Sequence, residues 1–120
     1  MVSIVAAANC DDHTKIFSFL LPEGDRWQLA PDYDLTHVHD SASQWMRQHL
    51  MAVNGTTAGI ERVDVTSVAD RVDVPGAARI VEQVLAPVDE WPCQANEAEV
   101  PEAIAHGIWA DLDVWSNRLH

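Results

Sequence analysis

Two acidic loops separated by two short apolar segments are the part of this sequence whose residue types suggest chemistry. The first loop contains Asp11 and the second contains Asp34. Between them lie the apolar segments 16–21 and 26–30, which are joined by the polar turn 22–25. This pattern is typical of a β-hairpin, whose outer ends meet in space. We therefore expect the two aspartates to be neighbours in the folded protein.

Two neighbouring carboxylates would suit magnesium-dependent phosphoryl transfer. Asp11 would orient a hydroxyl nucleophile and accept its proton. Asp34 would bind Mg²⁺, which prefers hard oxygen ligands and takes one or two protein carboxylates beside phosphates and water. The residues by themselves leave a simpler alternative, in which both aspartates only stabilise turns in exposed loops.

The two loops resemble the catalytic and metal loops of HipA-family kinases, which are bacterial serine/threonine kinases and in many cases toxins of toxin–antitoxin modules. The resemblance rests on the motifs Asn9-x-Asp11-Asp12-His13-x-Lys15-x-Phe17-Ser18-Phe19 and Leu29-Ala30-Pro31-x-Tyr33-Asp34. Through weaker matches it extends over residues 1–100, the C-terminal part of the kinase domain. It implies an α+β fold, the mainly helical C-lobe of a kinase-like domain with a small catalytic hairpin. Residues 101–120 would add a C-terminal helix to the same domain.

The resemblance also implies roles for individual residues. Asp11 would be the catalytic base and Asp34 the metal ligand. Lys15 would neutralise the transferred phosphoryl group, and His13 would shape the same loop by packing or hydrogen bonding. The implied cofactors are Mg²⁺ and ATP. The implied partners are a protein substrate, which is an aminoacyl-tRNA synthetase in related toxins, and an antitoxin that binds DNA.

Two features depart from the family pattern. Family members have an asparagine five positions after the catalytic aspartate, where this chain has Ile16. That asparagine helps to hold a second Mg²⁺, and isoleucine has no donor atom. We also expect the parts of a kinase that hold ATP, a Gly-rich loop and a strand lysine paired with a helix glutamate, to be missing upstream of Met1. We therefore expect a kinase fragment with doubtful nucleotide binding and no appreciable activity alone.

Two alternatives to an active kinase remain open at the level of sequence. The chain could be a non-catalytic interaction module or a gene remnant, bound to an antitoxin or to a separately encoded N-lobe. Alternatively, the closely spaced Asp32, Asp34, His37 and His39 could hold a transition metal that activates water, as in a metal-dependent hydrolase.

Composition limits the remaining function classes. The chain has 120 residues and a formal net charge of −12 with only seven basic residues, which disfavours direct binding of nucleic acid. No apolar run is long enough to span a membrane, so a cytoplasmic location is expected. Cys10 and Cys93 have no metal-binding spacing and are expected to be reduced thiols. The carboxylate beside Cys10 should raise the pKa of its thiol.

Helices should frame the acidic loops. We expect the end of a buried helix at 2–8, a helix at 61–72, a helix opened by Pro75 and stopped by Pro92 with a kink or break at Pro87, and a helix from Pro101. Asn54-Gly55 predicts a turn. The last helix should bury one apolar face, with Trp109 off that face as a candidate association surface. The members of the face are Ile104, Ile108, Leu112, Trp115 and Leu119.

Overall fold

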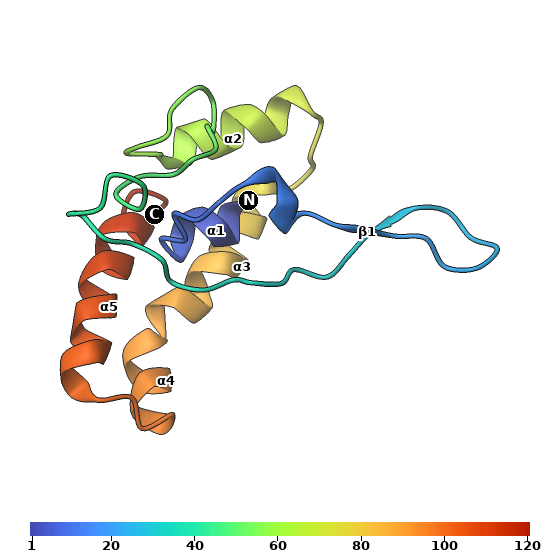
Figure 1. Ribbon diagram of the computed structural model, residues 1–120. Helices are drawn as coiled ribbons and strands as arrows, with labels where there is room; N and C mark the ends of the chain where they lie inside the picture. The colour runs from blue at the N-terminus through green and yellow to red at the C-terminus, as the bar shows by residue number, and fades with distance from the viewer.

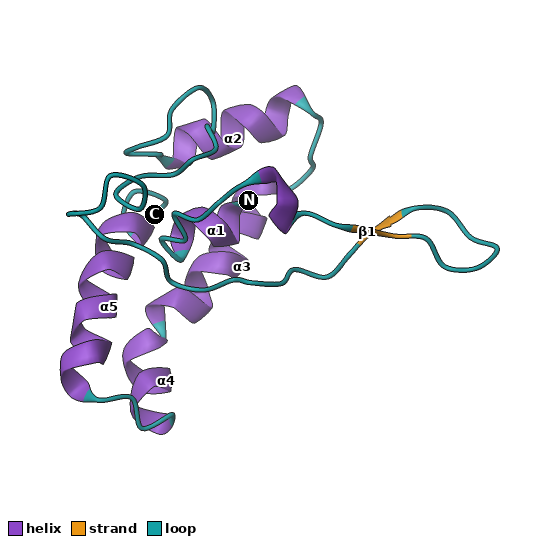
Figure 2. Cartoon of the chain, viewed as in Figure 1, coloured by secondary structure: helices purple, strands orange, loops and turns teal.

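A computed structural model describes all 120 residues as an α+β fold with five α-helices, one 3-10 helix and one two-stranded antiparallel sheet (Figure 1). Helices form most of the regular structure, and a hairpin projects away from them (Figure 2). The elements in chain order are α1 (Val2–Ala6), η1 (Thr14–Ile16), β1 (Phe19–Leu20), β2 (Gln28–Leu29), α2 (Arg62–Arg71), α3 (Ala77–Asp89), α4 (Trp91–Glu97) and α5 (Glu102–Ser116).

The core lies where α1, α3 and α5 pack together (Figure 1). Val5 of α1, Leu85 of α3 and Trp115 of α5 belong to one buried apolar cluster. Because α1 has only five residues, its own hydrogen bonds would not keep it helical. Burial of its side chains against the other two helices stabilises it instead. The expected buried helix at the start of the chain is therefore present, although it ends at Ala6.

A sharp turn ends α1 and sends the chain into the first acidic loop. The Asn9 N–H donates to the Ile4 carbonyl at 3.0 Å, and the Ala8 N–H donates to the Val5 carbonyl at 3.2 Å. Ala8 has a φ of 49°, in the left-handed region. These two bonds and the left-handed residue form a Schellman motif, which satisfies carbonyls at the helix end. The motif places Asn9 at the entrance of the acidic loop.

The expected hairpin is present but shorter than the apolar segments that predicted it. Phe19 pairs with Leu29 and Leu20 with Gln28 in antiparallel register. Residue 16, which we expected to begin the first strand, instead ends the 3-10 helix η1. The Lys15 carbonyl accepts a hydrogen bond from the Tyr33 hydroxyl at 2.6 Å. That contact closes the base of the hairpin with a side chain rather than with further strand pairing.

The helices in the second half of the chain follow the expected pattern with two corrections. α3 begins at Ala77 after Gly76, so Pro75 precedes the helix rather than opening it. Pro92 does not stop a helix: α3 runs through Pro87 to Asp89, and Pro92 lies in the first turn of α4. A proline is tolerated there because first-turn N–H groups have no helical partner.

The helix α5 begins after Pro101 as predicted, but only its C-terminal half buries the apolar face. Leu112 and Trp115 are each 5 % exposed, whereas Ile104 is 55 % exposed. The N-terminal half of α5 extends beyond the core alongside α4 (Figure 1). No helix of the chain combines the length and the apolar character needed to cross a bilayer.

The connection between β2 and α2 has no regular element, and two isolated bridges organise it. Asn9 forms a parallel bridge with Val38, and Val53 forms an antiparallel bridge with Thr56. Asn54 and Gly55, with φ of 53° and 89°, make the tight turn that the Asn-Gly pair predicts.

We predict opposite stability changes for the same substitution at two glycines. At Gly107, inside α5, an added Cβ meets no atom within 4 Å, so Gly107→Ala should raise the free energy of unfolding by about 0.5–1 kcal/mol. At Gly55 the space is equally open, but its φ of +89° strains any side chain, so Gly55→Ala should lower it. Urea unfolding of both variants checks this. A change of the same sign in both would contradict the assigned backbone conformations.

Candidate functional site

The side chain of Asn9 joins the two acidic loops. Asn9 is 3 % exposed, and its Nδ2 donates to the carbonyl of Asp34 at 3.0 Å. Its Oδ1 accepts the backbone N–H of Asp11 at 3.2 Å. The Cys10 N–H also donates to the Val38 carbonyl at 2.8 Å, which continues the contact along the second loop. The backbones of Asp11 and Asp34 are therefore bound to opposite ends of one amide side chain, as the hairpin led us to expect.

Both candidate carboxylates face solvent without a protein partner. Asp11 and Asp34 are exposed, and neither carboxylate accepts a hydrogen bond or forms an ion pair. Asp34 has a φ of 57°, in the left-handed region, which aspartate tolerates better than most residues. Such a conformation costs about 1–3 kcal/mol and is found preferentially at functional sites. The two carboxylates are free to bind a ligand from outside the chain.

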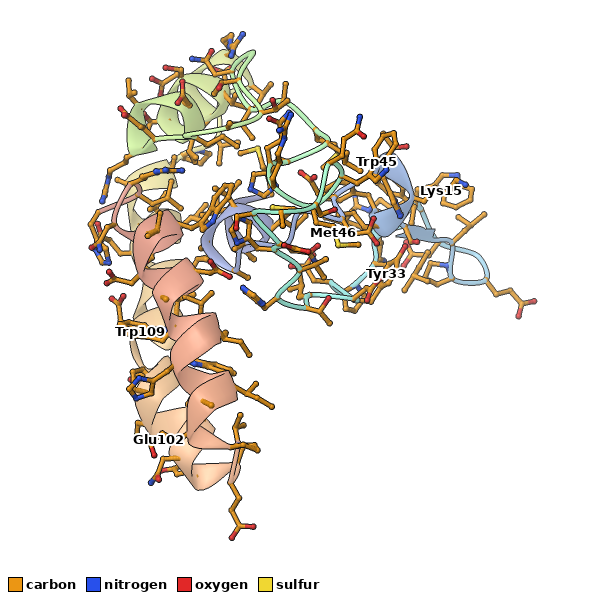
Figure 3. All side chains as sticks on the ribbon, turned by 60° about the vertical axis from the view of Figure 1, so that its left-hand side comes forward. Lys15, Tyr33, Trp45, Met46, Glu102 and Trp109 are labelled. Carbon is orange, nitrogen blue, oxygen red and sulfur yellow. The ribbon has the colours of Figure 1, made fainter.

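Lys15 lies in the turn between these loops, at the base of the hairpin with Tyr33 (Figure 3). The Tyr33 hydroxyl contacts both the Lys15 carbonyl at 2.6 Å and the Ser18 Oγ at 2.8 Å. The Lys15 ammonium forms no ion pair and is exposed. Tyr33 therefore positions the backbone of Lys15 while the charged end of that side chain stays free.

His13 does not shape the loop as we expected. Its side chain is exposed and makes no hydrogen bond, and only its carbonyl takes part in the turn, by accepting the Ile16 N–H. The contacts of Tyr33 and Asn9 set the loop conformation instead. Ile16 is half-buried at the end of η1, and its side chain offers no ligand atom.

A buried aspartate–histidine pair, which sequence reasoning missed, anchors the first acidic loop to the core. The Oδ2 of Asp12 lies 2.9 Å from the Nδ1 of His49, and its Oδ1 accepts the Leu50 N–H at 2.6 Å. The His49 ring packs edge-to-face against Trp115, with ring centroids 4.9 Å apart. The partners are 37 positions apart, and residues 36–49 show no hydrophobic period, so no local pattern indicated the contact.

The surroundings of His49 favour its neutral form. Burial lowers the pKa of His49. The carboxylate of Asp12 and the backbone of Asn9 oppose this shift, and the nearby imidazole of His39 adds to it. Nδ1 donates to Asp12, and the buried Nε2 has no hydrogen-bond partner. Protonating the ring would place a charge in a buried site, which is unfavourable.

The two histidines of the alternative transition-metal site, His37 and His39, contact Asp111 instead of the aspartates of the second acidic loop. His37 Nε2 lies 3.1 Å from one carboxylate oxygen of Asp111, and His39 Nδ1 lies 2.9 Å from the other. No three His, Cys, Asp or Glu side chains are grouped so that they could hold a metal ion. The hydrolase alternative is therefore not supported: Asp111 of α5, far along the chain, takes both histidines.

Cys10 is a buried thiol rather than a nucleophile. Burial, with Asp12 and Asp111 adding to it, raises the pKa of Cys10 to about 11. The expected direction is confirmed, but the main cause is burial, and the carboxylates responsible are not that of Asp11. Cys93 is exposed and unpaired.

We predict that His49 makes stability depend on pH. Because its pKa is lower in the folded than in the unfolded state, the unfolded chain binds more protons below about pH 6.5. The free energy of unfolding should therefore fall as the pH drops through this range. His49→Asn keeps a donor for Asp12 but cannot titrate, so it should be less stable and show a shallower pH dependence. Urea unfolding at several pH values measures both.

His106→Asn is the matched control, because the side chain of His106 is 80 % exposed. It should leave the pH dependence unchanged. An equal slope for wild type and His49→Asn would show that His49 is not the titrating group.

Comparison with known families agrees with the arrangement of these loops. The family model described as the HipA-like C-terminal domain matches residues 1–91, which include both acidic loops, the hairpin, α2 and α3. No curated protein and no solved structure matches the chain. The expected relationship is confirmed, and it leaves α5 and nearly all of α4 beyond the matched residues. The chain belongs to the family of HipA-like C-terminal domains.

Proposed function

We propose that this chain is the part of a HipA-type serine/threonine kinase that holds the substrate hydroxyl and the metal-bound phosphates. Its family membership supports the proposal. The observation that carries it is the Asn9 side chain, which binds both acidic loops and leaves the carboxylates of Asp11 and Asp34 unpaired and exposed.

In this function the exposed carboxylate of Asp11 orients a serine or threonine hydroxyl and accepts its proton. The carboxylate of Asp34 holds Mg²⁺, which supplies charge neutralisation on the phosphates of ATP. The free ammonium of Lys15 neutralises the transferred phosphoryl group, and Tyr33 fixes the backbone from which Lys15 extends. His13, exposed in the same turn, has no protein partner and is free to contact the protein substrate.

The side chains near the two acidic loops offer a ligand for one Mg²⁺, the carboxylate of Asp34, but none for a second. One protein carboxylate beside phosphates and water is an ordinary environment for Mg²⁺. The amide of Asn9 is already occupied by two backbone groups, and Ile16 has no ligand atom. We therefore propose that the second metal is bound weakly and that phosphoryl transfer is slow. None of the 120 residues forms a Gly-rich phosphate loop, so the other contacts to ATP would come from residues outside these.

We predict that Ile16→Asn strengthens binding of the second metal. The new side chain supplies an oxygen ligand, so the affinity for Mn²⁺ in the presence of ATP, measured by electron paramagnetic resonance, should rise by about tenfold or more. Asp34→Asn should weaken binding by a similar factor. Asp32→Asn, which changes an exposed neighbouring aspartate, should leave the affinity unchanged.

Activity adds a second measurement to the same variants. In the Ile16→Asn background, Asp11→Asn should reduce transfer of the ATP γ-phosphate to protein by about a hundredfold. Equal effects of Asp34→Asn and Asp32→Asn on metal affinity would contradict the proposed metal site. Rapid, Asp11-dependent transfer by the wild-type chain would support the kinase but contradict the role given to Ile16.

The hairpin favours a second candidate, a non-catalytic interaction module. The two strands are exposed on both faces: Phe19 and Leu29, paired on one face, are each 62 % exposed, and Leu20 on the other face is 52 % exposed. Trp27, directly before β2, is 67 % exposed. An antiparallel sheet normally buries one face, and an exposed apolar surface of this kind marks a binding site. An antitoxin or a separate N-lobe that covered the hairpin would also order the acidic loops at its base.

We predict that Trp27→Ser abolishes such an interaction without affecting folding. The side chain is mostly exposed, so the free energy of unfolding should change by less than about 0.5 kcal/mol. Co-purification with the co-expressed product of the adjacent gene should nevertheless be lost. Val63→Ser on α2, where Val63 is 60 % exposed, is the matched control. Equal co-purification of both variants would exclude the hairpin as the binding surface.

A further inference from the structure

A pocket between α4 and α5 lies mostly beyond the residues that match the family. It encloses about 550 Å³, and two indole rings, a carboxylate and an imidazole contribute to its walls. Trp109 and Glu102 lie along the same side of α5 (Figure 3). Nothing in the proposed phosphoryl transfer uses these residues. They are Trp91, Trp109, Glu102 and His106.

The indole rings of Trp91 and Trp109 line the pocket, and a hydrogen bond holds that of Trp91 in place. Trp91 donates its Nε1–H to the carbonyl of Ala105 at 3.2 Å, which ties α4 to α5. Trp109 lies one turn farther along α5 than Ala105 and is half-buried. It is therefore less exposed than we expected from sequence, because it lines the pocket. Each ring keeps part of its surface open to a ligand, and apolar surface of this kind gains from being covered.

The helices that form and adjoin the pocket carry an excess of negative charge, although Glu82, Asp89 and Asp111 have ionic partners elsewhere. From Arg79 to Arg118 the sequence contains no other lysine or arginine. Glu102 has one ionic neighbour, the His106 ring at 4.0 Å, and their side chains are 92 % and 80 % exposed. The acidic residues of this part of the chain are Glu82, Asp89, Glu90, Glu97, Glu99, Glu102, Asp111 and Asp113.

The geometry points to a docking site for an arginine side chain carried on a basic protein segment. A guanidinium group is attracted to the face of an indole and forms planar hydrogen bonds with a carboxylate, while its methylene stem packs on apolar surface. The pocket supplies both the indoles and the carboxylate, and the acidic helices around it would attract further basic residues. Nucleic acid or a second copy of this chain, with its charge of −12, would be repelled.

The test follows the indole N–H signals of the five tryptophans by nuclear magnetic resonance during titration with acetyl-Lys-Arg-Lys-amide. The signals of Trp91 and Trp109 should shift, while those of Trp27 and Trp45 should stay in place. The same peptide with citrulline in place of arginine should bind at least about fivefold more weakly, because it lacks the charge. Acetyl-arginine-amide alone should also bind more weakly, since the flanking lysines contribute.

Matched variants locate the site. Trp109→Leu should weaken binding of the arginine peptide by about fivefold or more, whereas Trp45→Leu, at a residue 70 % exposed elsewhere, should not. Glu102→Gln should weaken it by about two- to fivefold, and Glu23→Gln at the hairpin tip should have no effect. Because the side chain of Glu102 is 92 % exposed, this variant is expected to fold.

Three results would overturn the proposal. The first is equal binding of the arginine and citrulline peptides. The second is an equal effect of Glu102→Gln and Glu23→Gln. The third is a dimer of the unliganded chain in analytical ultracentrifugation that Trp109→Leu disrupts, since a second copy of the chain would then fill the pocket.

Discussion

The arrangement of the two acidic loops depends on one buried amide. The Asn9 side chain binds the carbonyl of Asp34 with its nitrogen and the N–H of Asp11 with its oxygen. A buried amide is stable only when its donor and acceptor are both used, and these two backbone groups use them. These contacts use only backbone groups of Asp11 and Asp34, whose carboxylates are exposed and have no protein partner. The loops are thus held by backbone bonds, which leaves the charged groups available for chemistry.

The position of Asn9 in turn depends on the core. The Schellman motif at the end of α1 directs Asn9 into the loop, and α1 is helical only because α3 and α5 cover it. The helix α5 adds two further contacts. Trp115 packs against His49, which binds Asp12, and Asp111 binds His37 and His39. A helix outside the family-matched residues therefore supports both acidic loops.

The contacts that position the two acidic loops are all present, whereas the proposed kinase chemistry would lack one metal ligand. Asp34 keeps a left-handed backbone, and Tyr33 fixes the turn that carries Lys15. In the proposed function, Ile16 would leave the second metal without a ligand atom. The hairpin between the loops exposes apolar residues on both faces, as expected of a surface that another protein part covers. The proposed slow phosphoryl transfer and the proposed binding role of the hairpin are compatible with one another.

Local patterns in the sequence were sufficient for several elements. The hairpin follows from two apolar segments around a polar turn, the tight turn from Asn54-Gly55, and the start of α5 from Pro101 with an apolar period. Each depends on residues within a few positions of one another, where backbone preferences and periodicity act. The proximity of the two aspartates followed from the hairpin alone, because a hairpin brings its ends together.

Only the tertiary structure decided the contacts between distant segments. Asp12 and His49 are separated by 37 positions, and His37 and Asp111 by 74. No spacing rule selects such pairs, since their energy depends on burial and on which helix covers which loop. The same reason explains why His37 and His39 bind Asp111 rather than forming the alternative transition-metal site, and why the apolar face of α5 is only half buried. Residue type and spacing determined what the loops could do, and packing of α1, α3 and α5 determined which side chains remained free to do it.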